Sequence, residues 1–153
     1  MDVATLQAFL VQAIPYNRLL NIQVKSVEPE QVEVVLPASP DHLNHVGTTH
    51  AGAQFSLGEA TSGAMVVSAF SDALANGVIP LATESTIRYR KPAQGELHGT
   101  ASLSSEEQTR LREIVARNQR AQFSISVQLK NSDGVTTTEL DVTWMLLPPR
   151  KPV

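Results

Sequence analysis

The sequence predicts an α+β domain in which antiparallel strands pack around one central helix. A segment with helical periodicity and many small side chains lies at about residues 50–71, several segments with two-residue alternation follow it, and turn sequences separate them. A chain of 153 residues is long enough to bury one hydrophobic core and short for two. We therefore expect a single domain spanning residues 1–153.

The N-terminal part is predicted to form a helix and then two strands. Residues 3–13 carry apolar side chains at the spacing of an amphipathic helix, which Pro15 ends or closely follows. Residues 22–27 and 32–36 have the composition of short strands and are joined by a tight turn. A loop with two prolines follows at 37–43.

The central helix is expected over residues 50–71. Apolar side chains recur there at steps of four and three and form one stripe: Ala53, Leu57, Ala60, Ala64 and Val67. The same segment contains poor helix formers: Gly52, Ser56, Gly58, Ser62 and Gly63. Because small side chains let another backbone approach closely, we expect packing against a sheet to stabilise this helix.

Strand patterns dominate the rest of the chain. Alternation predicts strands at 81–89, 97–103, 123–129 and 140–146, with a hairpin turn at 131–134. In the first of these strands, Thr83, Ser85, Ile87 and Tyr89 are expected on one face. Residues 104–120 interrupt the pattern with a mostly exposed helix, for which Ser104 with Glu107, or Ser105 with Gln108, could form a capping box.

Composition excludes several functional classes. A formal net charge of -3 gives no reason to expect a nucleic acid partner. The absence of cysteine excludes disulfides, thiol nucleophiles and thiolate metal sites. The N-terminus lacks the basic start of a signal peptide, and the longest apolar run, 51–70, is too polar for a membrane span. We expect a cytoplasmic protein that does not bind a membrane.

One segment, NHVGTTHAGAQFSLGEA at residues 44–60, has the features of a reaction site. Asn44, Gly47, His50 and Gly52 form a turn-like approach to the central helix, and Glu59 is the single carboxylate within that helix. The unpaired N–H groups at a helix N-terminus can hold a carbonyl oxygen or an oxyanion. A carboxylate nine residues after the histidine could then act on a water or a substrate held there.

Each of these side chains also has a structural explanation. Glu59 could lie at the solvent edge or pair with Arg88 or Arg90, because a buried unpaired carboxylate is costly. His50 could simply begin the helix, and Asn44 could form an Asx turn. No metal site is expected, because no carboxylate stands at compact ligand spacing to the three nearby histidines, His42, His45 and His50.

The motif and the order of elements resemble those of hotdog-fold acyl-CoA thioesterases, most closely the phenylacetyl-CoA group of the phenylacetic acid pathway. In that fold, a curved antiparallel sheet wraps a long central helix. The group's pattern of asparagine, glycine, His-Gly-Gly and a later acid is matched by Asn44, Gly47, His50 and Glu59. The resemblance covers residues 20–147, and residues 1–19 would add an N-terminal helix.

Three features depart from the pattern of the group. His-Gly-Gly is replaced by His-Ala-Gly, so that the methyl group of Ala51 narrows the approach to the backbone N–H at that position. The acid is a glutamate, Glu59, where the group usually has an aspartate. The helical insert at 105–120 is larger than the connection typical of the group.

The resemblance implies hydrolysis of an acyl-CoA thioester to a free acid and CoA. The N–H of Ala51 would polarise the thioester carbonyl, and His50 would shape the carbonyl site. Asn44 would bind the attacking water or the thioester, and Thr83 falls where some members carry a residue that helps place the water. Glu59, contributed by the partner subunit, would act as general base or as nucleophile.

The resemblance also implies how the substrate is held and how the chain assembles. Arg88, Arg90 and Lys91 would bind the phosphates of CoA, which is part of the substrate, so no separate cofactor is expected. We expect a homodimer, or a tetramer made of two dimers, because a single chain of this fold leaves an edge strand and a half-built site exposed.

Two other functions remain open from the sequence. A non-catalytic acyl-CoA-binding protein is favoured by Ala51 and by the inserted helix. A hotdog hydratase or dehydratase ranks third, because such enzymes pair an acid with a histidine, and Asp41 lies nine residues before His50, a longer gap than they use. Nothing in the sequence selects the acyl group.

Overall fold

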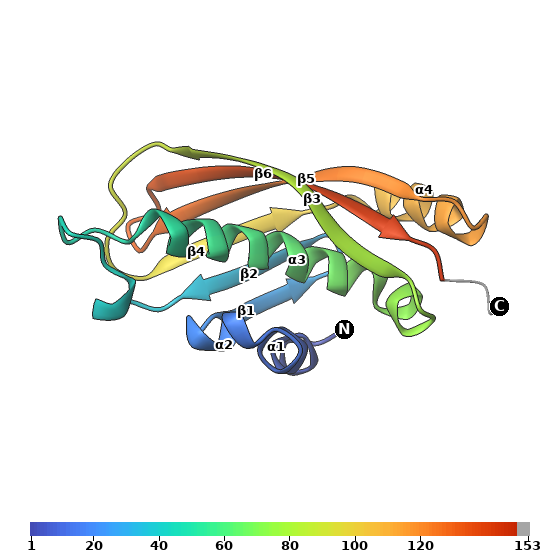
Figure 1. Ribbon diagram of the computed structural model, residues 1–153, viewed down its shortest axis with the longest axis horizontal. Helices are drawn as coiled ribbons and strands as arrows, with labels where there is room; N and C mark the ends of the chain where they lie inside the picture. The colour runs from blue at the N-terminus through green and yellow to red at the C-terminus, as the bar shows by residue number, and fades with distance from the viewer. Residues whose placement is uncertain (150–153) are drawn as a thin grey trace.

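The structure, a computed structural model, describes residues 1–149 and shows one antiparallel sheet wrapped around a long helix (Figure 1). The elements are α1 (Val3–Gln12), α2 (Pro15–Leu19), β1 (Gln23–Glu28), β2 (Gln31–Leu36), the 3-10 turn η1 (Pro40–His42), α3 (Ala51–Ala75), β3 (Ile79–Tyr89), β4 (Leu97–Ser102), α4 (Ser105–Ala116), β5 (Ala121–Asn131) and β6 (Thr136–Leu147). The strand order is β1-β2-β4-β5-β6-β3. The predicted α+β class and hotdog architecture are confirmed.

The helix α3 lies against one face of the sheet, and two glycines allow the close approach. A Cβ atom at Gly58 would lie 2.5 Å from both Cδ atoms of Leu140 on β6. One at Gly99 on β4 would overlap the hydroxyl of Thr61 on α3. A larger residue at either position would push the helix off the sheet. Packing therefore outweighs the poor helix propensity of the small residues in α3.

The core lies between α3 and the sheet and follows the predicted alternation on β5 and β6. Every second residue of β5 from Ala121 to Leu129 is buried. On β6 the buried face includes Leu140, Val142, Trp144 and Leu146. The indole Nε1 of Trp144 donates a hydrogen bond to the hydroxyl of Ser62 on α3, at 3.1 Å. This bond fixes the orientation of the ring where the sheet meets the helix.

The N-terminal segment differs from the prediction of a single helix. It forms a hairpin of two helices, α1 and α2, that lies beside α3 (Figure 1). Pro15 does not merely end the first helix but begins the second, where its fixed φ and missing N–H are tolerated. Leu6 and Leu10 are buried, and the buried amide of Asn17 donates to the carbonyl of Leu10 at 3.4 Å. The hairpin is thus packed onto the domain.

The edge strand β3 also departs from its predicted pattern. It begins at Ile79, and α3 before it extends to Ala75 rather than ending near residue 71. The register passes from Ala82 opposite Trp144 to Glu84 opposite Thr143, which leaves Thr83 as the extra residue of a β-bulge. The uninterrupted alternation predicted over 81–89 is therefore wrong at Thr83. Within the part of the chain that the structure describes, β3 pairs only with β6.

The inserted helix α4 begins with one half of a predicted capping box, that of Ser104 and Glu107. The hydroxyl of Ser104 accepts the backbone N–H of Glu107 at 3.2 Å. The Glu107 side chain binds Arg110 instead of returning to the cap. Leu111 and Val115 are buried against the domain. None of the helices between residues 1 and 149 has the length and apolar character needed to cross a membrane.

Candidate active site

Glu59 lies in the wall of a cavity of ≈ 400 Å³ between α1, α3, β3 and β6. It is the only charged residue of the lining, and its side chain is partly buried. Within residues 1–149 its carboxylate takes part in no hydrogen bond and no ion pair. Removal from water raises the pKa of Glu59 above its ordinary value. A carboxyl group of this kind is suited to accept a proton near neutral pH.

The arginines that could have paired with Glu59 have other partners. Arg88 Nη1 lies 2.8 Å from Asp141 Oδ2, and Arg90 Nη2 lies 2.8 Å from Glu139 Oε2. Both are cross-strand pairs between β3 and β6. The structure therefore excludes a salt bridge of Glu59 with Arg88 or Arg90 of the same chain.

His50 caps the N-terminus of α3. Its Nδ1 accepts the backbone N–H of Gly52 at 2.9 Å, and its own backbone N–H donates to the carbonyl of His42 at 2.7 Å. Because Nδ1 accepts, the neutral ring carries its proton on Nε2, which has no hydrogen-bond partner within residues 1–149 and can donate to a ligand. A Cβ atom at Gly52 would lie 3.1 Å from Nδ1, so a glycine at this position leaves room for the ring.

The first residue of α3, Ala51, offers an unused donor. Among the residues described, the backbone N–H of Ala51 donates no hydrogen bond. Its carbonyl accepts the hydroxyl of Tyr89 at 3.0 Å, which ties β3 to the start of the helix. The buried Gln54 donates to the carbonyl of Thr49 at 2.8 Å and accepts from Thr138 on β6. These contacts hold the free N–H in a fixed direction.

Tyr89 and Gln54 were not identified from the sequence. The sequence did indicate a role for Gln54, because an amide side chain within an apolar helix needs hydrogen-bond partners inside the protein. For Tyr89 the alternation placed the ring on a face of the strand but could not specify a bond to the Ala51 carbonyl.

Asn44 stabilises the loop that leads to His50. Its Oδ1 accepts the backbone N–H groups of Val46, at 3.0 Å, and Thr48, at 3.1 Å. Its Nδ2 donates to the hydroxyl of Thr48 at 2.8 Å. The side chain therefore forms the Asx turn that was the structural alternative, and both halves of the amide are occupied.

The predicted site residues fall into two groups. A second cavity, of ≈ 390 Å³, is lined by residues that include Asn44, Ala51, Tyr89, Arg90 and Lys91, but not Glu59. Residues 51 and 59 are eight positions apart on α3, which separates them by about 12 Å along the helix at 1.5 Å per residue. No single carbonyl group can contact both the Ala51 N–H and the Glu59 carboxylate of one chain.

Three predicted residues line neither cavity: His50, which caps α3 next to Ala51, and also Thr83 and Arg88. Thr83 occupies the β-bulge, and its hydroxyl donates to the carbonyl of Thr143 at 3.3 Å. Arg88 belongs to the exposed ion pair with Asp141. Neither residue lines the cavity at Glu59 or the cavity at the start of α3.

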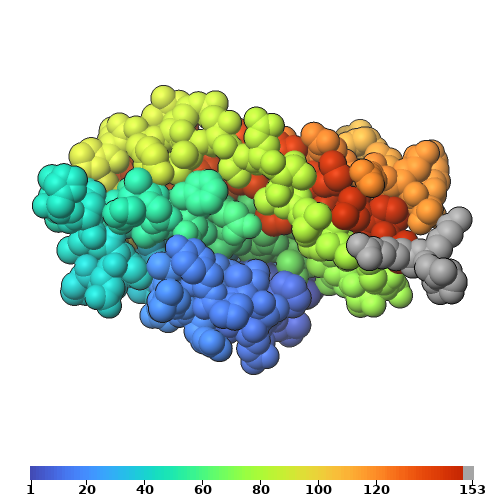
Figure 2. Space-filling model, in the orientation of Figure 1, coloured from blue at the N-terminus to red at the C-terminus, as the bar shows by residue number. Residues whose placement is uncertain are grey.

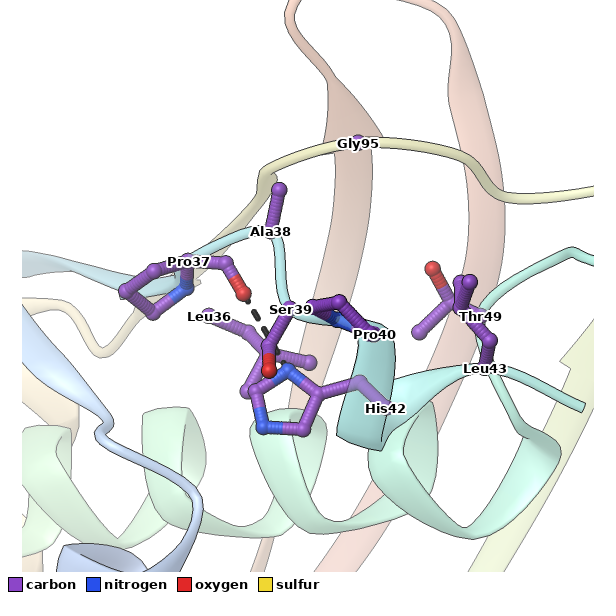
Figure 3. Close-up of a pocket in the computed structure, with 9 residues that line it drawn as sticks. All are labelled: Leu36, Pro37, Ala38, Ser39, Pro40, His42, Leu43, Thr49 and Gly95. Carbon is purple, nitrogen blue, oxygen red and sulfur yellow. Dashed lines mark hydrogen bonds between the residues drawn. The ribbon is translucent and has the colours of Figure 1, made fainter.

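A third, smaller cavity of ≈ 260 Å³ lies under the loop that follows β2 (Figure 3). The buried ring of His42 donates through Nδ1 to the carbonyl of Pro37 at 3.1 Å and so braces the backbone that holds His50. Residues 1–149 contain no group of three histidine, cysteine or acidic side chains that could hold a metal ion. His42 serves the shape of the loop.

The sequence matches a protein-family model described as a domain of unknown function, DUF4442, over residues 3–146. The chain belongs to the DUF4442 family. This match includes the N-terminal hairpin as well as the sheet and α3. No protein of curated function matches the sequence.

Solved structures share the fold of this DUF4442 chain. A protein of unknown function from Pseudomonas aeruginosa, described as a "probable thioesterase", is 24% identical with a TM-score of 0.85 over 96% of both chains. A mutant thioesterase from Pseudomonas aeruginosa is 15% identical with a TM-score of 0.76, covering 97% of this chain and 95% of the other. A mutant thioesterase from Staphylococcus aureus is 18% identical with a TM-score of 0.67, covering 88% and 99%. At these identities the likeness establishes the fold.

Replacing Asn44 by alanine in the DUF4442 chain should lower the free energy of unfolding by on the order of 1 kcal/mol, because two backbone N–H groups and one hydroxyl lose their partner. Chemical denaturation measures the change. Asn44→Asp is the matched variant, since its carboxylate still accepts both N–H groups and should recover most of the loss. Equal losses in both variants would show that the Asx turn is not the source of the stability.

Proposed function

We propose that this chain hydrolyses acyl-CoA thioesters. The observation that carries the proposal is Glu59, an unpaired carboxylate with a raised pKa in the wall of an apolar cavity. An unpaired, partly buried carboxylate costs stability, so a functional reason for keeping it is favoured. Proteins of the same fold that are named as thioesterases support the reaction class.

The reaction needs the two groups of residues to meet, and a second copy of the chain would bring them together. In a two-fold dimer, the Ala51 N–H of one subunit would face Glu59 of the other subunit. The free edge of β3 supports pairing at this place, because unpaired strand edges favour addition of another strand. Ile79 and Leu81 on that strand are exposed apolar residues, which contact with a second subunit would bury.

In the completed site, the thioester carbonyl oxygen would accept the Ala51 N–H and the Nε2–H of His50. Glu59 would take a proton from water as the water attacks the carbonyl carbon, or would itself attack to form an anhydride. The C–S bond then breaks and CoA leaves as the thiol after protonation. In the second route a water then attacks the Glu59 carbonyl of the anhydride, which regenerates Glu59 with one solvent oxygen and releases the product acid with an oxygen from Glu59. A single turnover in heavy-oxygen water separates the routes, since the label enters the product acid in the first and Glu59 in the second.

A panel of acyl-CoA substrates with release of free thiol as the readout tests the activity directly. We expect turnover of at least one acyl-CoA, and phenylacetyl-CoA belongs in the panel because the motif resembles that group. If the protein binds acyl-CoA but hydrolyses none, the acyl-CoA-binding alternative replaces the enzyme. The exposed methyl group of Ala51 at the carbonyl site is the observation that favours that alternative.

The CoA phosphates would bind at the mouth of the second cavity. Arg90 and Lys91 line it, but the charge of Arg90 is balanced by Glu139, whereas Lys91 forms no ion pair among residues 1–149. Lys91 is therefore the group whose charge is most available to a phosphate. Arg88 is paired with Asp141 and lies outside the cavity.

Replacing Lys91 by alanine should raise KM for acyl-CoA several-fold and leave kcat nearly unchanged, because the nucleotide lies far from the reacting carbon. Steady-state kinetics measures both constants. An acyl-N-acetylcysteamine substrate, which lacks the nucleotide, should show no change, and Arg88→Ala is the matched exposed-cation control. Equal effects on both substrates would assign Lys91 to the fold or to the chemistry.

A further inference from the structure

We propose that the cavity beside Glu59 receives the acyl group, and that Gly63 and Trp144 set the size of the acyl group the enzyme accepts. The acyl group must be apolar along its whole length. This inference rests on the proposed thioester hydrolysis, and it adds the substrate class and the residues that select it.

The lining of the cavity supports an apolar occupant. It comes from α1, α3, β3 and β6, and all of its residues except Glu59 are hydrophobic or glycine. An acyl chain with a carboxylate at its far end would bury that charge in a lining without a cation, where the indole N–H of Trp144 is already bonded to Ser62. The cavity therefore favours hexanoyl-CoA over adipoyl-CoA, which has the same number of acyl carbons and a terminal carboxylate.

The floor of the cavity is fixed in place at Gly63. A Cβ atom there would lie 3.5 Å from Cζ2 and Cη2 of Trp144, which is ordinary contact distance, so an alanine fits and a longer side chain extends into the cavity. Trp144 is held by Ser62, whose hydroxyl donates in turn to the backbone carbonyl of Glu59 at 2.8 Å. The wall and the proposed catalytic carboxylate thus belong to one hydrogen-bonded unit.

The opposite wall is the N-terminal hairpin. Phe9 and Ile14 line the cavity while each keeps more than a third of its surface exposed. In Figure 2 the surface of α3 remains visible between the N-terminal segment and β3. An acyl chain longer than the cavity would therefore meet Phe9 and Ile14 rather than the packed core.

Chain-length selectivity tests the assignment of Gly63. In the unmutated protein, kcat/KM for hexanoyl-CoA should exceed that for adipoyl-CoA by about tenfold or more, and Gly63→Leu should lower the ratio of decanoyl-CoA to acetyl-CoA turnover by about tenfold or more. Leu19→Ala is the control, because Leu19 is an exposed residue of the N-terminal hairpin and does not line the cavity. An unchanged ratio, or an equal loss on every chain length, would overturn the proposal.

Two further variants test the same proposal even if the Gly63→Leu protein does not fold. Gly63→Ala should shift the same ratio in the same direction by a smaller factor, and it gains helix propensity, so its fold is secure. Phe9→Ala should shift the ratio toward longer chains, because it opens the hairpin wall. If both variants leave the ratio unchanged, the cavity does not select the acyl group.

Fluorescence tests occupancy of the cavity without turnover. Trp144 is the only tryptophan of the chain, so all indole emission reports on the cavity wall. An acyl-CoA with bromine at the far end of a hexanoyl chain should quench this emission in the Glu59→Gln protein, whereas CoA alone should not. Absence of quenching would overturn the proposal.

The fluorescence and kinetic outcomes separate this inference from the proposed activity. Quenching together with no hydrolysis of any thioester would leave the acyl cavity standing and remove the enzyme. Hydrolysis with neither quenching nor a response to Gly63 would leave the enzyme and remove the acyl cavity.

Discussion

Replacing Glu59 by glutamine should lower kcat for acyl-CoA hydrolysis by at least about a hundredfold, the low end of general acid–base contributions. Glutamine keeps the size and hydrogen-bonding capacity of the side chain but can neither take a proton nor attack a carbonyl carbon. Binding of acyl-CoA should persist, because Ala51 and Lys91 lie in the other cavity. Glu84→Gln, an exposed glutamate on β3, is the matched control. Full activity of Glu59→Gln would exclude the proposed mechanism.

The Glu59→Gln substitution should also stabilise the fold at neutral pH, whereas replacing a glutamate with a structural role would destabilise it. Burial raises the folded-state pKa of Glu59 above the ordinary value of 4.5, so the ionised form is disfavoured in the folded protein. This destabilisation is absent below the unfolded pKa and complete above the folded pKa. Thermal unfolding should therefore show a higher Tm for Glu59→Gln at neutral pH and no difference below pH 4.5. A lower Tm at neutral pH would reveal a stabilising partner of the carboxylate.

Replacing Ala51 by proline should lower kcat by about a hundredfold to a thousandfold, the cost of removing one oxyanion donor. Proline removes the backbone N–H and is tolerated at the first residue of a helix. The preceding residue, His50, already has φ -56° and ψ 140°, the extended conformation that a following proline favours. The fold should therefore survive, which circular dichroism can verify. Unchanged kcat would show that this N–H does not contact the reacting carbonyl.

Mixing the two inactive variants tests whether the site is shared. If Ala51 and Glu59 meet across a dimer, a hybrid of Ala51→Pro and Glu59→Gln subunits contains one intact site and one doubly defective site. Refolding an equal mixture should restore roughly a quarter of wild-type activity, since half of the dimers are hybrids and each has one working site of two. No recovery in a mixture shown to contain hybrid dimers would place the whole site within one subunit.

The elements with regular periodicity could be predicted from the sequence because one face of each is buried. β5 and β6 each pack one face on α3. On β5, the apolar residues at every second position, Phe123, Ile125 and Val127, indicate which face is buried. Irregular features depend on contacts between distant residues. At Phe70 the backbone of α3 leaves helical geometry, and Arg112 of α4 donates to the carbonyl of Ala69 beside it. This contact joins α3 to the insert 43 residues later in the chain, and no local sequence pattern encodes it.

For the candidate site, the sequence indicated where each residue lies along the chain but not how the residues are arranged in space. The sequence placed His50 at the start of the central helix and Glu59 within it, and in the structure His50 is the N-cap of α3 and Glu59 lies inside α3. That Ala51 and Glu59 line two separate cavities depends on how the N-terminal hairpin and β3 cover α3, which is tertiary packing. The Asn44 side chain is occupied by its own loop, an outcome that the Asx-turn alternative anticipated.

The close approach of α3 to the sheet fixes the position of the helix that carries Glu59, whereas the N-terminal hairpin is not held in this way. Gly58, next to Glu59, packs against Leu140, and Gly99 packs against Thr61. A Cβ atom added at either glycine would overlap that neighbour. Change there would require paired replacements. The N-terminal hairpin carries no such constraint at Phe9 and Ile14, which are partly exposed. Substitutions at Phe9 and Ile14 would therefore change the hairpin wall of the proposed acyl cavity and leave the packing that positions Glu59 intact.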